Sequence, residues 1–131
     1  MKEYFLVIDQ GTTSSRVVLY NKKFRIFDIA QKEFDQHFPK EGWVEHNAIE
    51  IWNDVKNLII KILKKNNLLS KNIISIGITN QRETTVVWNK KTGVPIYNAI
   101  VWQDRRTSFY CSNLRKKGLQ KKNTKNYWIR T

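Results

Sequence analysis

Residues 8–17 read IDQGTTSSRV, and the fold of the chain follows from this stretch. An apolar run at residues 4–8 leads into it, and a second apolar run follows at residues 17–20. Both runs are short and rich in β-branched and aromatic residues, which predicts two buried strands. Between them lie an acid, a glycine, four hydroxyl side chains and an arginine. We therefore expect a turn that can present backbone N–H groups and hydroxyls to one anionic group.

Two interpretations of this turn are open. Gly11 lets the backbone approach a bound group closely, and Asp9, at the strand end, could hold a metal through water. The stretch lacks the Gly-Lys-Ser/Thr ending of a P-loop, so it is not that phosphate-binding motif. A polar hairpin turn without a ligand is the alternative, and it is the commoner outcome for such a stretch in an arbitrary protein.

The composition is that of one domain with a hydrophobic core. The chain has 131 residues, 40% of them hydrophobic, with five Trp, five Tyr and six Phe to fill an interior. Its single cysteine, Cys111, allows no internal disulfide and suits a reducing compartment. No apolar stretch approaches the ~20 residues of a membrane span, and the N-terminus lacks the features of a signal peptide. We therefore predict a cytoplasmic protein without a membrane span.

The net charge of +13 permits a nucleic-acid partner but does not require one. Lysines occur in scattered pairs at predicted turns and helix ends, not on one face or in one run. Asn and Ile are also abundant, and all three residue types have A/T-rich codons. Compositional drift therefore explains the charge at least as well, and we do not expect a nucleic-acid partner.

The next segments predict a meander and a loop. Residues 24–30, extending toward residue 34, predict a third strand, and short turns between three consecutive strands favour an antiparallel meander. Residues 35–47 contain Pro39 and Gly42 and predict a loop. His46 within it is expected to be a hydrogen-bonded structural residue, not a ligand.

A long helix and an apolar strand are predicted after this loop. Asn47 and Glu50 have the spacing of a helix N-cap with a returning carboxylate. Apolar residues then recur every three or four positions, which is typical of an amphipathic helix on a sheet, ending near residues 66–67. The apolar run at residues 73–78 predicts an interior strand that is covered on both faces.

The last predicted elements are smaller. Residues 86–96 predict a β-hairpin, and residues 100–102 predict a short strand. Residues 108–117 predict a helix, for which Gly118 is the C-terminal stop.

Three clusters of charged and amide side chains each follow an apolar strand, at residues 9–10, 80–83 and 103–105. In an α/β sheet, strand ends of like direction open onto one crevice, where ligands bind. Arg82 and Glu83 suit a small polyol, because a guanidinium donates to hydroxyl oxygens and a carboxylate accepts from hydroxyl hydrogens. Trp102 could lie against the carbon atoms of such a ligand. A surface ion pair is the alternative for Arg82 and Glu83, and it is equally open on spacing alone.

Four separate blocks of this sequence resemble one family. They are DQGTTSSR at residues 9–16, GWVEH at 42–46, GITNQRETT at 77–85 and PIYNAIVWQ at 95–103. In this order and spacing they closely resemble the glycerol kinases of the FGGY carbohydrate-kinase family. The resemblance extends from Phe5 to about Thr124. Its fit over four blocks is far more specific than any one motif.

The resemblance implies an α/β fold of the actin-like ATPase (ribonuclease H-like) type, with a mixed sheet that starts with an antiparallel meander. Residues 1–118 are then expected to be the incomplete N-terminal portion of the first kinase domain. Residues 119–131 are expected to be a basic, poorly ordered tail.

The resemblance also implies a reaction, the ATP-dependent phosphorylation of glycerol to glycerol 3-phosphate, with Mg²⁺ as cofactor. Carried over by position, the residues expected to contact the nucleotide are Thr12, Thr13, Ser14 and Arg16. Asp9 is expected beside the transferred phosphoryl group and the metal, which it would hold through water. Arg82 and Glu83 are expected to bind glycerol hydroxyls, and Trp102 to pack on its carbon atoms.

Family members are several times longer than this chain. In them the aspartate that acts as general base, a tyrosine of the glycerol pocket and the adenine-binding domain all lie in later segments. Residues 125–131 also depart from the family pattern. We therefore expect a truncated chain that is inactive alone, with a separately encoded C-terminal remainder as a partner. Two other functions stay open: a small basic binding or regulatory module that keeps the fold without catalysis, and a kinase for another polyol.

Overall fold

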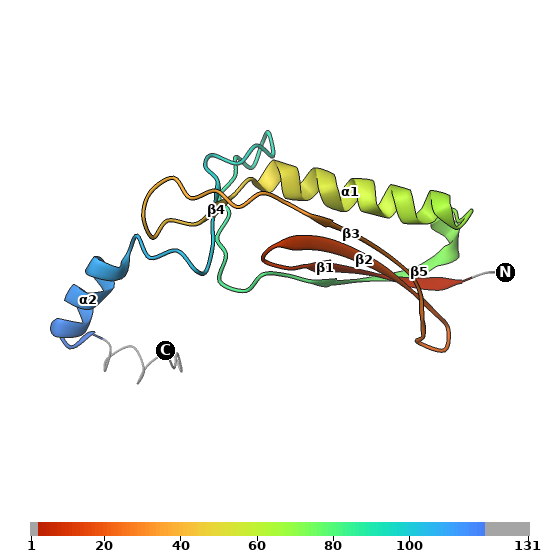
Figure 1. Cartoon of the computed structure of the whole chain (residues 1–131), viewed down its shortest axis with the longest axis horizontal. Coiled ribbons are helices and arrows are strands. Elements are labelled where there is room, and N and C mark those ends of the chain that lie inside the picture. Colours follow the sequence, from red (N-terminus) through yellow and green to blue (C-terminus); the bar gives the residue numbers. More distant parts are fainter. Residues whose placement is uncertain (1–2, 120–131) are drawn as a thin grey trace.

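The computed structural model describes residues 3–119 of the chain (Figure 1). Its elements in chain order are β1 (Tyr4–Gln10), β2 (Ser14–Asn21), β3 (Ile26–Glu33), β4 (Glu45–His46), α1 (Ala48–Lys65), the 3₁₀ turn η1 (Ser70–Asn72), β5 (Ile73–Thr79), β6 (Ala99–Ile100) and α2 (Ser108–Lys116). Of the predicted basic tail, residues 120–131 lie outside the described part.

The larger sheet has four strands in the order β3-β2-β1-β5. The pairs β1–β2 and β2–β3 are antiparallel, so the predicted meander is confirmed. β5 returns parallel to β1 after the crossover through α1, which makes the sheet mixed. The turn between β1 and β2 is closed by a hydrogen bond of 3.0 Å from the Gly11 N–H to the Ser14 carbonyl. A Cβ added at Gly11 would lie only 3.2 Å from that carbonyl oxygen, so the turn favours glycine here.

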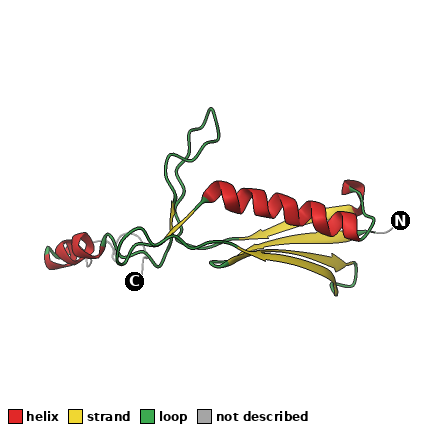
Figure 2. Cartoon of the chain, turned by 45° about the horizontal axis from the view of Figure 1, so that its top comes forward, coloured by secondary structure: helices red, strands yellow, loops and turns green. Residues whose placement is uncertain are grey.

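Helix α1 runs along one face of this sheet (Figure 2). The side chain of Asn47 accepts hydrogen bonds from the N–H groups of Ile49 and Glu50, so the predicted N-cap is confirmed. The helix ends at Lys65, one residue before the predicted end, with Asn66 as the C-cap.

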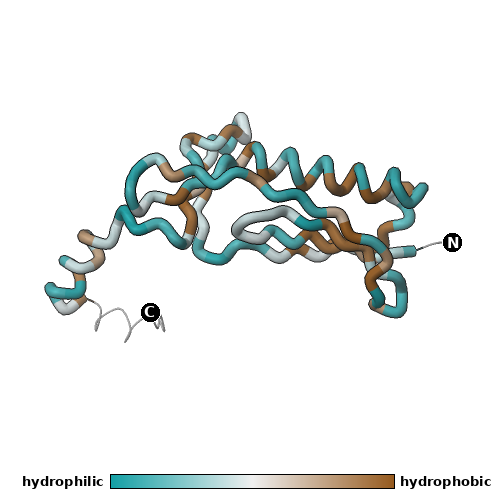
Figure 3. Tube along the Cα trace, in the orientation of Figure 1, coloured by the Kyte–Doolittle hydropathy of each residue, from teal (hydrophilic) through white to brown (hydrophobic). Residues whose placement is uncertain are grey.

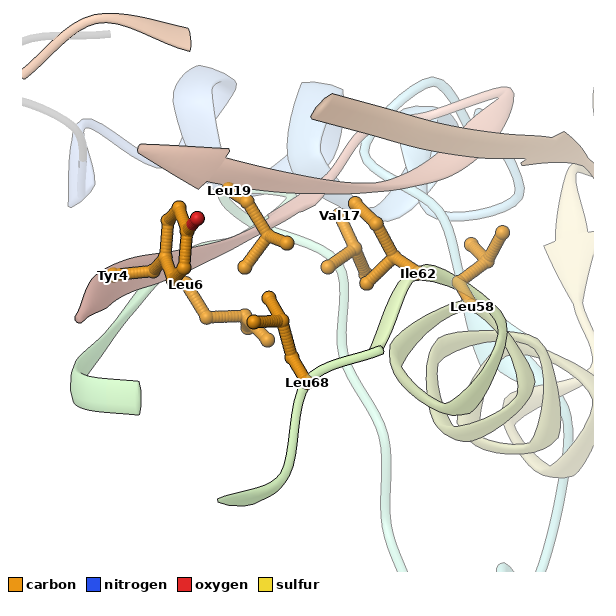
Figure 4. Packing of buried hydrophobic residues seen from close by; sticks show 7 residues of the cluster. All are labelled: Tyr4, Leu6, Val17, Leu19, Leu58, Ile62 and Leu68. Atoms are coloured by element: carbon orange, nitrogen blue, oxygen red, sulfur yellow. The ribbon is translucent and has the colours of Figure 1, made fainter. Parts of the chain in front are cut away.

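The core lies between α1 and the sheet (Figure 4). Its buried side chains come from the two central strands, from α1 and from the segment after it: Tyr4, Leu6, Val17, Leu19, Leu58, Ile62 and Leu68. The hydropathy colouring follows this arrangement, with hydrophobic residues concentrated along the sheet and recurring at intervals along α1 (Figure 3).

The prediction of an interior strand covered on both faces at residues 73–78 is wrong. β5 forms the edge of the sheet in the described part of the chain, and the exposed fractions of Ile74, Ile76 and Ile78 are 49%, 56% and 73%. Ile76 is in register with Leu6, and Ile78 is in register with Ile8. Among residues 3–119, helix α1 makes its main strand contacts with β2 and β3, so only Ile73 of β5 packs against the core and the rest of the strand stays exposed.

A second, two-stranded sheet joins β4 to β6. β4 lies within the segment predicted to be a loop, where two residues are too few to produce an alternating pattern. The predicted hairpin at residues 86–96 is present, closed by bonds from the Asn89 N–H to the Val94 carbonyl and from the Ile96 N–H to the Val87 carbonyl. The predicted strand at residues 100–102 is shorter and earlier, since β6 ends at Ile100.

Helix α2 projects from one end of the molecule (Figure 1), and none of its residues is buried. Its range agrees with the prediction to within one residue, and Gly118 beyond it has a φ of +73°, the left-handed conformation of a helix stop. Within residues 3–119 no helix has both the length and the apolar character needed to cross a lipid bilayer.

Truncation of Ile62 is expected to destabilise the chain strongly. Ile62 is fully buried, so Ile62→Ala should lower the free energy of unfolding by about 3 kcal/mol through lost burial and a residual cavity. Ile60→Ala is the matched control, because Ile60 lies on the same helix and is 50% exposed. Urea unfolding followed by circular dichroism measures both, and equal losses for the two variants would contradict this packing.

Candidate functional site

A cavity of about 560 Å³ opens at the carboxyl ends of β1 and β5. The residues that line it are Asp9, Gln10, Gly11, Thr12, Asn80, Gln81, Arg82, Glu83 and Trp102. β1 and β5 are parallel neighbours, with Asp9 opposite Thr79, so the segments that follow them emerge at one edge of the sheet. Two of the three polar clusters therefore converge as predicted.

Arg82 and Glu83 lie in the loop that follows β5, and both side chains are exposed. Glu83 has a φ of +62°, in the left-handed region, which costs a non-glycine residue roughly 1 kcal/mol. Such strained residues concentrate at ligand sites, where the surrounding structure imposes the conformation. The two residues therefore lie on a constrained loop that lines a cavity. Arg82 and Glu83, both within the described residues, do not form the ion pair with each other that the alternative interpretation expected.

Trp102 joins the cavity from a segment that is distant in sequence. Its indole Nε1–H donates a hydrogen bond of 3.1 Å to the Thr12 hydroxyl. The side chain stays 53% exposed, so the ring is available to the cavity that it lines. The residue lies in the turn after β6 and not in a strand as expected. This bond links the predicted phosphate turn directly to the predicted polyol-binding aromatic residue.

Three of the predicted nucleotide residues lie beside the cavity without lining it: Thr13, Ser14 and Arg16. Ser14 Oγ accepts a bond of 3.2 Å from the Gln31 side-chain amide, and Arg16 Nε donates one of 3.0 Å to Gln31 Oε1. Gln31, on β3, had no role in the sequence analysis, because only the strand pairing brings it opposite Arg16.

Asp9 and Arg16 are cross-strand neighbours, and Arg16 Nη1 lies 3.7 Å from Asp9 Oδ2. The Asp9 side chain is 41% exposed, so part of the carboxylate remains open to the cavity. Among residues 3–119 no group of three or more His, Cys, Asp or Glu side chains is placed to hold a metal ion. A metal at Asp9 would need most of its ligands from water or from a bound phosphate.

The third polar cluster was predicted to lie at the cavity, but it does not line it. Residues 103–105 are absent from its lining, and the Asp104 carboxylate instead accepts hydrogen bonds from the Val44 N–H and from Arg106. Arg106 also donates to Glu45 at 2.7 Å, and its guanidinium lies 3.8 Å from the centre of the Trp43 ring. Spacing in the sequence hides this arrangement, since Glu45 and Arg106 are 61 positions apart.

This buried ionic cluster fixes the segment that carries Trp102. Hydrogen bonds from Arg106 hold the pKa of Asp104 at about 2, against the opposing effect of burial. Burial raises the pKa of Glu45, but hydrogen bonds from Arg106, Asn98 and Tyr97 outweigh it and leave that pKa below its usual value. The same contacts raise the pKa of Arg106. The cluster therefore stays ionised and ties residues 97–106 to β4.

His46 is fully buried and hydrogen-bonded, as predicted for a structural histidine. Its ring contacts Gln36, which composition and spacing gave no reason to select, and Gln81, which belongs to the polar cluster after β5. Gln10, Asn80 and Gln81 line the cavity but had no assigned role, although they belong to the polar clusters noted after β1 and β5.

Comparison with known proteins gives consistent matches. The sequence model of the FGGY family of carbohydrate kinases, N-terminal domain, matches residues 4–129. A glycerol kinase from Bacillus velezensis is 59% identical over 118 residues, which make up 90% of this chain and 24% of that protein. The chain thus spans about a quarter of the length of this curated relative.

Solved structures agree with the fold. The crystal structure of Plasmodium falciparum glycerol kinase with ADP is 40% identical and superposes with a TM-score of 0.79, over 88% of this chain and 23% of that one. A ligand-bound xylulose kinase from Lactobacillus acidophilus is 20% identical, with a TM-score of 0.85 over 94% of this chain and 24% of that one, and it shows the same fold. The expected fold class is confirmed.

The ionic cluster predicts a pH dependence of stability. Because the folded-state pKa of Asp104 lies near 2, below its ordinary 3.8, its contribution is complete above about pH 4 and is lost as pH falls toward 2. That contribution is about 2 kcal/mol. Asp104→Asn should therefore be less stable than the parent chain at pH 7, and the gap should narrow between pH 4 and pH 2. Denaturant unfolding at several pH values measures it. A constant gap, or an equal effect of Asp35→Asn at an exposed carboxylate, would contradict the assignment.

Proposed function

Because the chain belongs to the FGGY family of carbohydrate kinases, we propose that its cavity binds glycerol and holds one glycerol hydroxyl against the terminal phosphate of ATP. One observation carries the proposal: Arg82, Glu83 and Trp102 meet Asp9 and Thr12 around a single cavity. The residues expected to bind glycerol and those expected to bind the phosphate can therefore contact the two substrates side by side. The 59% identity to a glycerol kinase supports glycerol over another polyol.

The polyol half of the site has the chemistry for a triol. The Glu83 carboxylate accepts hydrogen bonds from hydroxyl groups, and the Arg82 guanidinium donates to hydroxyl oxygens. The indole face of Trp102 covers the carbon atoms, which excludes water from one side of the ligand. An acceptor and a donor on one strained loop fix which hydroxyls each group can reach.

The phosphate half is the turn between β1 and β2. Thr12, Thr13 and Ser14 supply hydroxyl and backbone N–H donors, and Arg16 supplies positive charge. Ser14 and Arg16 share Gln31 as a partner, so these groups are already oriented before any phosphate arrives. Preorganised donors cost little rearrangement when negative charge develops on the transferred group.

In the proposed reaction the terminal hydroxyl oxygen of glycerol bonds to the γ-phosphorus, and the bond from that phosphorus to the bridging oxygen of ADP breaks. The hydroxyl proton passes to a carboxylate base, which the resemblance locates in a later segment than this chain contains. Asp9 fits a magnesium ion, which favours one or two carboxylates together with water and phosphate oxygens. When bound, Mg²⁺ would neutralise charge on the phosphates.

The chain spans about a quarter of its relatives' length, so we propose that it is one part of a catalytic site and is inactive alone. Further segments, outside the 131 residues of this sequence, would supply the base and the opposing domain. The exposed isoleucines of β5 support this, because they offer apolar surface for further segments to cover. Without the base and the opposing domain, the site would lack alignment of the reactants, exclusion of water and a proton acceptor.

Glycerol is expected to bind the isolated chain weakly, with a Kd of the order of 1 mM, because only part of a pocket is present. Titration followed through the indole N–H resonance of Trp102 measures it. Glu83→Gln and Arg82→Met should each weaken binding about tenfold or more, since each loses a charge-assisted hydrogen bond. Arg105→Met is the matched control, because Arg105 does not line the cavity. Equal binding of propane-1,2-diol, which lacks one hydroxyl, would contradict the proposed recognition.

Glycerol phosphorylation by the pure chain is expected to stay at background. The assay follows transfer of ³²P from the γ-position of ATP to glycerol with Mg²⁺ present. The control is a triple variant, Asp9→Asn with Arg82→Met and Glu83→Gln, which removes groups from both halves of the site. Transfer above that control would show that these residues are catalytic by themselves and would overturn the proposed need for further segments.

A further inference from the structure

His46 lies between Gln36, which bonds the phosphate turn at Thr12, and Gln81, which lines the cavity. It lies in β4 opposite Ala99, and its ring meets the ring of Phe34 edge-on, with centroids 5.0 Å apart. Its Nε2 lies 2.5 Å from Gln36 Oε1, and its Nδ1 lies 3.3 Å from Gln81 Nε2. Both ring nitrogens of a fully buried histidine therefore contact glutamine side chains, and neither contact belongs to the proposed chemistry.

Other hydrogen bonds orient both glutamines. The Gln36 Nε2 donates to the Thr12 carbonyl at 3.2 Å and to the Phe34 carbonyl at 3.4 Å, which leaves its oxygen facing His46. The Gln81 oxygen accepts from the Thr84 hydroxyl at 2.9 Å, which leaves its NH₂ group facing His46.

These orientations permit only one form of the His46 ring. Nε2 must carry a proton to donate to Gln36, and Nδ1 must be unprotonated to accept from Gln81. An imidazolium would place an N–H against the NH₂ group of Gln81, donor against donor. Burial, and secondarily the proximity of His37, also lowers the pKa of His46, which favours the neutral ring.

We propose that neutral His46 is a positioning residue that fixes the separation between the phosphate turn at Thr12 and the polyol loop at residues 81–83. The connection runs from the Thr12 carbonyl through Gln36, His46 and Gln81 to the residues next in sequence, Arg82 and Glu83. This inference rests on the proposed function for its meaning, because it assigns a role to the spacing of those two loops.

A second link makes the spacing more rigid. Trp102 bonds the Thr12 hydroxyl on the cavity side, while Gln36 bonds the Thr12 carbonyl on the His46 side. Thr12 is thus held through two different groups. In phosphoryl transfer, a displacement of about 1 Å between reacting groups can cost roughly 10²-fold in rate, so such a tether acts on alignment, not on chemistry.

The first test is the protonation state of the ring. The chain has two histidines, so His37→Gln assigns the remaining imidazole ¹⁵N resonances to His46. At neutral pH, long-range ¹H–¹⁵N correlation spectra should show His46 protonated at Nε2 only. A ring protonated at Nδ1, or at both nitrogens, would overturn the proposal.

The second test separates the two hydrogen bonds. An asparagine amide can occupy the place of Nδ1, and a glutamine amide the place of Nε2. His46→Asn should shift the backbone amide resonances of Thr12 and Thr13 but leave those of Gln81 and Arg82. His46→Gln should do the reverse, and His46→Phe should shift both sets. His37→Gln should shift neither. Equal disturbance of both loops by the Asn and Gln variants would indicate a role in packing only and would overturn the proposal.

Gln81→Leu covers the case in which the His46 variants fail to fold. It removes the Gln81 end of the connection at a half-buried position, so it should shift the Nδ1 resonance of His46 and, like His46→Gln, leave the Thr12 amide unshifted. An unchanged Nδ1 resonance of His46 would overturn the proposal. None of these experiments uses a ligand, so they stand apart from the glycerol titration. An intact connection in a chain that does not bind glycerol would count against the proposed function alone.

Discussion

The parallel pairing of β1 with β5 is the constraint on which the site depends. It places Asp9 opposite Thr79, so the turn after β1 and the loop after β5 emerge side by side. Parallel neighbours need a crossover, and α1 provides it while it packs on β2 and β3 and helps to bury core side chains of β1 and β2. The helix that forms the core is therefore also the connection that brings two distant polar segments to one edge.

Contacts made by β4 fix the positions of the segments that the sheet brings to the cavity. The buried cluster of Glu45, Asp104 and Arg106 holds the segment that carries Trp102, and His46, next to Glu45 on β4, contacts the polyol loop. The two-residue strand β4 is thus linked to the segment that carries Trp102, to the polyol loop and, through Gln36, to the phosphate turn. Breaking a buried ion pair leaves an uncompensated charge, so such a cluster tolerates few alternative arrangements. The buried ionic cluster therefore contributes more to a specific geometry than to net stability.

Sequence patterns were sufficient where a local rule acts alone. Asn47 marked the start of α1, the alternation of short apolar runs gave the meander, and the polar residues after β1 and β5 marked the cavity. Patterns failed where a distant partner decides. The continuous apolar run of β5 indicated burial on both faces, but burial depends on what lies over the strand. Asp104 looked like a cavity residue, but Arg106 and the Val44 N–H hold it elsewhere. The hydrogen bonds of Gln31, Gln36 and Gln81 depend on contacts between distant segments, which residue spacing in the sequence does not show.

The exposed edge formed by β5 has a consequence for handling the isolated polypeptide. In the part of the chain that the structure describes, β5 is an exposed, isoleucine-rich edge strand, and such an edge can pair with another copy of itself, which is a route to aggregation. The net charge of +13 opposes such association, because like-charged copies repel one another. Added electrolyte screens that repulsion over about 10 Å at 0.1 M ionic strength. Aggregation of the free chain therefore depends on the balance between pairing at the β5 edge and charge repulsion between copies. Low ionic strength strengthens the repulsion and should keep the chain in solution.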